Sequence, residues 1–161
     1  MPKQAMKSRI LSYQELGEID QLHSKANSIL REAGDRLRSY DADLAVRRSQ
    51  EAAELHTKTI FRFIGREYPR THDLEKTVYE VSVLLEEYGV GRGEVARMVL
   101  ANSTLAAWRL PAFYGDERLG VAKVFRQKEG EVAVAYAEEM RMICEKVRAE
   151  LYRRARPATS T

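Results

Sequence analysis

A short polar corner holds several of the side chains that could do chemistry. Tyr68, Arg70, His72 and Asp73 follow one another closely, between two segments with helical patterning. An arginine can bind phosphate through paired hydrogen bonds, a histidine can transfer a proton near neutral pH, and a tyrosine ring can stack on a base. The corner therefore has the residue types of a nucleotide or phosphate site. His72 and Asp73 are equally suited to capping the helix that follows, with Tyr68 packing the corner.

A second group of such residues follows a later helical segment and comprises Arg109, Tyr114 and Asp116. Arg109 falls on the apolar stripe predicted for residues 94–110, and an inward-facing arginine needs a carboxylate, helix-end carbonyls, a second subunit or an anion as its partner. Asn102 falls on the same stripe and is interpreted as a satisfied polar residue of the bundle or of an interface. We therefore expect this helix to contribute to a phosphate site and to contacts between two copies of the chain.

The elements that must position these residues are five helices separated by short breaks. Apolar residues recur at steps of three and four over residues 12–33, 40–64, 73–89, 94–110 and 128–157. Ser12 and Glu15 have the spacing of a capping box, and the breaks coincide with Gly34, Gly65 and Pro111. The glycine-rich residues 89–93 follow a helix rather than a strand, so they predict an interhelical turn and not a phosphate loop. The pattern predicts an all-α, up-and-down helical bundle of about five helices.

This topology would bring the two groups of polar residues together. Residues 73–89 and 94–110 are similar in length and joined by a short turn, which favours antiparallel packing. The end of the second helix would then return to the beginning of the first. We expect Arg109, Tyr114 and Asp116 to lie at the same end of the bundle as Tyr68, Arg70, His72 and Asp73. An arginine-rich patch at the opposite end, from residues 36–48 and 148–156, is interpreted as solvated helix ends.

Length and composition restrict the class of protein. The chain has 161 residues, of which 44% are hydrophobic and 32% charged, and its net charge is +3. These totals suit one domain, residues 1–161, with loosely ordered ends at about residues 1–11 and 157–161. The single Cys144 excludes an internal disulfide framework and, with no apolar run of about 20 residues, favours a cytoplasmic protein.

Metal and cofactor sites are not predicted. No histidine and cysteine residues have the local spacing of a zinc site, and no catalytic Ser/His/Asp triad can be recognised in the sequence. His56 is interpreted as a satisfied, half-buried residue, and His23 is assigned no role.

Residues 49–74, SQEAAELHTKTIFRFIGREYPRTHDL, resemble the central signature of the HEPN (higher eukaryotes and prokaryotes nucleotide-binding) domain family. The matching parts are residues 50–54 on the helix and residues 68–74 at the corner, and the likeness in helix pattern extends over roughly residues 12–155. The resemblance implies the same all-α bundle, a homodimer and the binding of nucleotide or RNA. Related small HEPN proteins are often paired with a minimal nucleotidyltransferase in toxin–antitoxin-like modules, which makes such a partner protein an expectation here.

HEPN ribonucleases carry an arginine followed, after four to six intervening residues, by a histidine, and two copies form one composite site. Arg109 matches the arginine, but Tyr114 stands where the histidine is expected. A phenol stays protonated near neutral pH and is a poor general base, so this departure argues against metal-independent RNA cleavage. Three hypotheses remain. The chain binds nucleotide or RNA phosphate beside a nucleotidyltransferase, it is an active endoribonuclease with a degenerate site, or it is a structural interaction bundle without a ligand.

Overall fold

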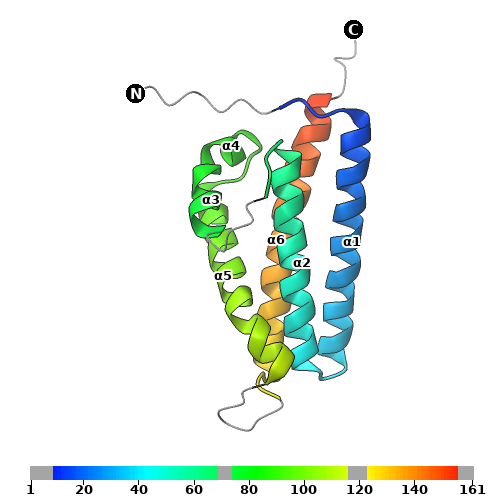
Figure 1. The fold of residues 1–161 in the computed structure, drawn as a ribbon, viewed down its shortest axis with the longest axis vertical. Coiled ribbons are helices and arrows are strands. Elements are labelled where there is room, and N and C mark those ends of the chain that lie inside the picture. The colour runs from blue at the N-terminus through cyan, green and yellow to red at the C-terminus, as the bar shows by residue number, and fades with distance from the viewer. Residues whose placement is uncertain (1–8, 69–73, 116–122, 156–161) are drawn as a thin grey trace.

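Six helices form the part of the chain that the computed structural model describes, namely residues 9–68, 74–115 and 123–155. They are α1 (Tyr13–Arg38), α2 (Ala42–Phe63), α3 (Leu74–Glu80), α4 (Ser82–Glu87), α5 (Arg92–Tyr114) and α6 (Gln127–Ala155). Four long helices, α1, α2, α5 and α6, lie side by side, and the short α3 and α4 lie beside the first half of α5 (Figure 1). The predicted all-α bundle is confirmed. None of the described helices is both long and apolar enough to cross a membrane.

Helix α2 is the central element because it packs against α1, α5 and α6. Its early turns bury the small residues Ala45, Ser49 and Ala52, and its last turns bury Phe61 and Phe63. Neighbouring helices can therefore approach α2 closely at its beginning, whereas large apolar side chains fill the space at its end. The polar corner that follows α2 is thus attached to a fully buried part of the core.

Backbone hydrogen bonds at the end of α2 fix Gly65 and Arg66, the residues that lead into the polar corner. The amide of Arg66 donates to the carbonyl of Phe61, and that of Gly65 donates to the carbonyl of Arg62, which are the two bonds of a Schellman motif. Gly65 has a φ of 72°, and a Cβ atom there would lie 3.0 Å from the Cβ of Arg9. Glycine is therefore required both by the backbone conformation and by the close approach of the segment before α1.

Helix α1 begins as predicted but ends later. The capping box between Ser12 and Glu15 is present. The helix continues through Gly34 to Arg38, because one glycine costs an α-helix only about 1 kcal/mol. The part of α1 that follows Gly34 packs closely on α6: a Cβ atom on Gly130 of α6 would come within 2.9 Å of the Leu37 side chain. This packing offsets the cost of Gly34. The prediction that Gly34 ends the helix is wrong.

The predicted helix at residues 73–89 is divided at Val81 into α3 and α4. The hydroxyl of Ser82 donates to the Tyr79 carbonyl at 2.7 Å, and such a local side-chain bond competes with the helical backbone pattern. Helix α5, in contrast, is longer than predicted, because it runs through Pro111 and ends at Tyr114 rather than at Leu110. Proline removes the donor to the carbonyl of Ala107, a residue that is exposed, so water can replace the lost bond.

A polar contact crosses the core between α2 and α5. The amide group of Asn102 donates to Thr57 Oγ1 at 3.1 Å and to the Met98 carbonyl at 2.9 Å, and the Thr57 hydroxyl donates to the Ala53 carbonyl at 2.8 Å. Asn102 is therefore a satisfied polar residue of the bundle, as predicted. This contact sets how α5 lies along α2, and it thereby sets which residues of the two helices meet beyond it.

Candidate functional site

Tyr68 is the described residue of the polar corner, and it faces helix α2. Its ring lies edge-on to Phe61, with ring centroids 5.7 Å apart, and Lys58 Nζ lies 5.2 Å from the centroid of the Tyr68 ring. Arg70, His72, Asp73 and Asp116 lie outside the described residues. Their predicted place in the site therefore stays a prediction.

Glu54 of α2 is the partner of Lys58, the lysine that lies against the Tyr68 ring. Lys58 Nζ and Gln50 Nε2 each donate to the Glu54 carboxylate at 2.8 Å. Partial burial acts to raise the pKa of Glu54, but these two bonds and the positive charges of Lys58 and Arg109 outweigh burial and leave that pKa below its usual value. Burial, together with the charge of Glu54, raises the pKa of Tyr68 to about 12. At neutral pH the site therefore combines an ionised carboxylate, a lysine cation and a protonated phenol.

Arg109 is exposed on α5, close enough for its charge to act on Glu54. Its predicted inward orientation is wrong. The buried face of α5 passes through Met98, Asn102 and Leu105 and ends at Ala112, so Arg109 lies on the flank of that face. An exposed guanidinium needs no buried partner, and this one can meet a ligand from solvent.

Tyr114 lies farther along the bundle. It is 66% exposed, and its ring centroid is 4.6 Å from that of Phe113. The guanidinium of Arg47 lies 4.0 Å from the Phe113 ring. Arg47 precedes Lys58 by 11 positions on α2, which corresponds to about 16 Å of helix. The prediction that Tyr114 lies at the same end of the bundle as Tyr68 is therefore wrong: α5 packs antiparallel to α2, and its 23 residues carry it back to the beginning of α2, whereas Tyr68 follows the end of that helix. Arg109 lies between these two ends, close enough for its charge to act on Glu54.

Sequence reasoning missed Glu54 and Lys58 as members of this site. A signal was present, because Gln50, Glu54 and Lys58 recur at steps of four and must share one face of α2. That face is half-buried rather than fully solvated, which allows the three side chains to pair with one another and with the corner.

A surface pocket of about 550 Å³ adjoins Tyr68 on the side of α1. Its basic lining residues are Arg9, Lys58, Arg62 and Arg66, and its acidic ones are Glu15 and Glu67. Lys58 lines this pocket and is also hydrogen-bonded to Glu54, and Tyr68 lines the pocket beside it. The positive excess around Tyr68 favours an anionic ligand.

Helix α5 carries an exposed stripe without charge, directed away from the core. Its members are Ala96, Leu100, Ser103, Ala107, Leu110 and Tyr114, all of them exposed. No charged residue occurs between Arg97 and Arg109. A helix that is apolar on both its buried and its exposed face is typical of one covered by another protein surface.

The arginine-rich groups at residues 36–48 and 148–156 do not meet, as far as the described residues show. The beginning of α6 packs on the turn after α1, where Gln127 Nε2 donates to the Leu37 carbonyl at 2.9 Å. Its far end instead meets Asp20, to which Arg148 donates at 2.8 Å. Arg153 and Arg154 both pair with Glu150, which agrees with their interpretation as a solvated helix end.

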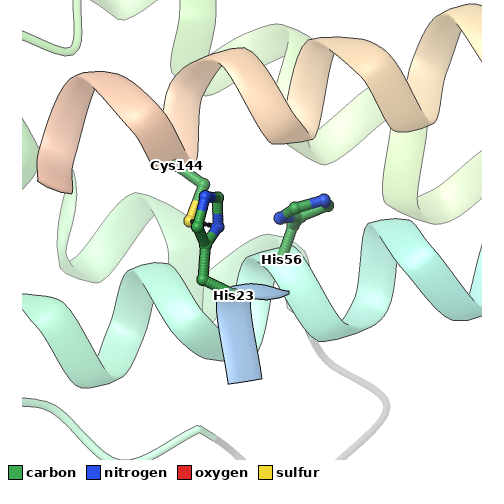
Figure 2. A group of neighbouring side chains, drawn as sticks. All are labelled: His23, His56 and Cys144. Atoms are coloured by element: carbon green, nitrogen blue, oxygen red, sulfur yellow. Dashed lines mark hydrogen bonds between the residues drawn. The ribbon is translucent and has the colours of Figure 1, made fainter. Parts of the chain in front are cut away.

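Two histidines and the cysteine meet in the core, contrary to the sequence interpretation. His23 of α1, His56 of α2 and Cys144 of α6 are all buried, and one ligand-type atom from each lies within 4.8 Å of the other two (Figure 2). His23 Nε2 is 2.7 Å from Glu145 Oε1, so this histidine, to which the sequence analysis assigned no role, makes a polar contact with α6. His56 is fully buried, and neither ring nitrogen has a hydrogen-bond partner among the described residues, so the prediction of a satisfied, half-buried residue is wrong.

The fold and the site together define an all-helical protein with a cation-rich corner beside its central helix. A family model described as the HEPN domain matches residues 19–147. The chain therefore belongs to the HEPN domain family, and the resemblance at residues 49–74 is confirmed. No curated protein matches the chain in a sequence search.

Proposed function

We propose that this HEPN protein binds nucleotide or RNA phosphate at the corner formed by Arg109, Lys58, Tyr68 and the residues that follow Tyr68. The observation that carries the proposal is the set of cations around Tyr68: Lys58 Nζ lies 5.2 Å from the centroid of its ring, and three arginines line the adjoining pocket. Arg109 of α5 is close enough for its charge to act on Glu54, the partner of Lys58. Arginine and lysine supply the phosphate contacts, and the protonated Tyr68 can donate a hydrogen bond or stack on a base.

Binding is favoured over catalysis by the protonation states of the described residues. A ribonuclease that works without metal needs a group that accepts the proton of a ribose hydroxyl near neutral pH. With its pKa raised to about 12, Tyr68 keeps its proton, and Glu54 is engaged by Lys58 and Gln50. Tyr114 replaces the histidine of the family motif. The proposed role is therefore recognition of the ligand.

The proposed assembly is a two-fold homodimer through the uncharged stripe of α5. A second copy of the same stripe is the occupant that best matches a surface composed of Leu100, Ser103, Ala107, Leu110 and small neighbours, because it is apolar and has no charge to satisfy. Arg109 borders this stripe and lies outside it. In such a dimer both Arg109 side chains would lie at the edge of the interface, where one phosphate backbone can reach them.

The proposed partner protein is a minimal nucleotidyltransferase in a toxin–antitoxin-like module. This part of the proposal rests on membership of the HEPN family alone. A pull-down from the native organism, with nucleotides and RNA retained, tests it. Recovery of a nucleotidyltransferase together with the chain is the expected result, and recovery of the chain without one would remove this part of the proposal.

Phosphate binding is tested by comparing Arg109→Ala with Arg153→Ala in titrations of a labelled single-stranded RNA and of ATP. Loss of one charged hydrogen-bond donor costs about 1.5–3 kcal/mol, so Arg109→Ala should weaken binding roughly tenfold or more. Arg153 is engaged with Glu150 and should matter little. A greater loss with Arg153→Ala would contradict the assignment of phosphate binding to Arg109. No binding by the wild type would favour a structural bundle without a ligand.

A further inference from the structure

The buried group of His23, His56 and Cys144 has no part in the proposed function. Its members come from three different helices, α1, α2 and α6; Cys144 and His23 point toward each other, and His56 lies beside them (Figure 2). The three side chains are at most 6% exposed as residues, and Cys144 and His56 are fully buried. Three groups of this kind at one point in an otherwise apolar core call for a physical reason.

The Glu145 carboxylate indicates that the proton of His23 is on Nε2, because a carboxylate oxygen accepts only, whereas the Asn27 amide beside the same nitrogen can present either its nitrogen or its oxygen. Nε2 lies 2.7 Å from a carboxylate oxygen of Glu145, a position in which an N–H donates. Nδ1 then carries the lone pair, and it lies 3.5 Å from Cys144 Sγ. A histidine whose outer N–H donates to a carboxylate, while its other nitrogen faces a sulfur, has the arrangement that metal-bound histidines commonly show.

His56 completes the group and is the observation that points to a ligand. It is fully buried, both ring nitrogens are without a hydrogen-bond partner among the described residues, and its ring centroid lies 5.5 Å from that of His23. An imidazole in this position has a ring nitrogen whose lone pair is directed to no hydrogen-bond donor among the described residues. A thiol-to-imidazole hydrogen bond explains Cys144 and His23, but it leaves His56 unexplained.

We propose that Cys144 Sγ, His23 Nδ1 and one ring nitrogen of His56 form a zinc site that joins α1, α2 and α6. A tetrahedral zinc with bonds of about 2.05 Å to nitrogen and 2.3 Å to sulfur separates these two ligands by about 3.5 Å. That separation is the one found between His23 Nδ1 and Cys144 Sγ. The largest separation among the three ligand atoms is within 4.8 Å, so a modest rotation of the side chains would bring all three onto one ion.

The charges in such a site would balance. Binding replaces the thiol proton of Cys144, which passes to solvent, and the resulting thiolate contributes one negative charge. The Glu145 carboxylate, held at His23 Nε2, contributes the second, and it is partly exposed. Two negative groups thereby match a divalent cation. Arg148, which lies 4.0 Å from Glu145, is itself paired with Asp20.

A surface hollow lies near the outer nitrogen of His23. Asn27, whose Nδ2 lies 3.2 Å from His23 Nε2, borders this hollow of about 610 Å³ between α1 and α6.

Metal addition to the chelator-treated full chain, produced without a histidine tag, tests the site. Co²⁺ is the spectroscopic probe, because a bound thiolate gives a sulfur-to-cobalt charge-transfer band and tetrahedral geometry gives intense visible bands. We expect both bands, with saturation at about one ion per chain, and displacement of Co²⁺ by Zn²⁺. At one hundred times the dissociation constant, zinc should raise Tm by roughly 5–10 °C.

Variants identify the ligands. Cys144→Ser should abolish the charge-transfer band, and His56→Gln should weaken binding at least tenfold, whereas His72→Ala, which removes the third histidine of the chain, should leave the spectrum unchanged. Wild-type protein without a cobalt spectrum and without a zinc-dependent change in Tm would overturn the proposal, and this measurement needs no variant to fold. A spectrum that survives Cys144→Ser and disappears with His72→Ala would also overturn it. Either result leaves phosphate binding at Arg109 untouched.

Discussion

In the proposed phosphate site, Glu54 would hold the neighbouring cations in place in the absence of a ligand. Its carboxylate accepts hydrogen bonds from Lys58 and Gln50 and lies within the field of Arg109. The half-buried position strengthens these interactions relative to a fully solvated ion pair. An arriving phosphate brings more negative charge than Glu54, so it can attract the Arg109 guanidinium while Lys58 remains positioned.

Restoring the family motif tests whether catalysis is limited by one residue. Tyr114→His would place a group that ordinarily titrates near pH 6.5 at the position of the family's histidine. General acid–base catalysis of this kind contributes roughly 10²–10⁴-fold. We expect wild type to be weak or inactive on unstructured RNA and the variant to gain cleavage in the presence of a chelator, as measured by gel assay.

The control for this assay is His72→Ala, since His72 is the histidine of the polar corner. The same substitution in the Tyr114→His background should leave the gained cleavage largely intact. Robust cleavage by wild type that disappears with His72→Ala would contradict the prediction. It would also make His72 the general base and the chain an active endoribonuclease.

At the scale of residues, sequence patterns indicated only part of the site. Tyr68 and Arg109 are recognisable by residue type and by position relative to the helix breaks. Glu54 and Lys58 were missed because their importance depends on which face of α2 meets α5. His23, His56 and Cys144 are 33 and 88 residues apart, so no local spacing identifies them, and only the packing of three helices brings them together.

At the scale of elements, the Asn102–Thr57 contact is expected to fix the packing of α5 on α2. Asn102→Ala removes hydrogen bonds to Thr57 and to the Met98 carbonyl and leaves a small cavity. The free energy of unfolding should fall by about 1–3 kcal/mol. Chemical denaturation measures this change. Ser103→Ala, at the exposed neighbouring position, should change stability by less than about 0.5 kcal/mol; equal losses from both variants would contradict the assigned role of Asn102.

The helices could be predicted from periodicity, whereas some of their ends could not. The capping box at Ser12, the end of α2 before Gly65 and the turn at residues 89–91 follow from local rules of chain geometry. Gly34 and Pro111 failed as breaks because tertiary contacts and an exposed carbonyl offset their local cost. The division at Val81 depends on one hydroxyl bond from Ser82, which competes with the backbone and has no periodic signature.

At the scale of the whole molecule, the proposed dimer and the proposed phosphate site are connected through α5. The buried face of this helix holds the core through Met98, Asn102 and Leu105. Its exposed stripe ends at Leu110 and Tyr114, beside Arg109. Contact between two copies would therefore place both Arg109 side chains at one interface edge. A monomer would offer a single arginine to the ligand.

The most direct test of this connection combines light scattering with titration of a labelled single-stranded RNA, for wild type and for Leu110→Glu. Leu110 is 64% exposed, so a carboxylate is tolerated by the folded chain but not by an apolar interface. The matched control is Val83→Glu on α4, where the valine is 71% exposed and lies off the stripe. We predict that wild type and Val83→Glu are dimers and bind RNA with the same affinity. Leu110→Glu should be a monomer and should bind RNA at least roughly tenfold more weakly, although its Arg109 is intact. A monomeric Leu110→Glu variant that binds RNA as tightly as wild type, or a wild type that is monomeric at micromolar concentration, would contradict a composite site across α5.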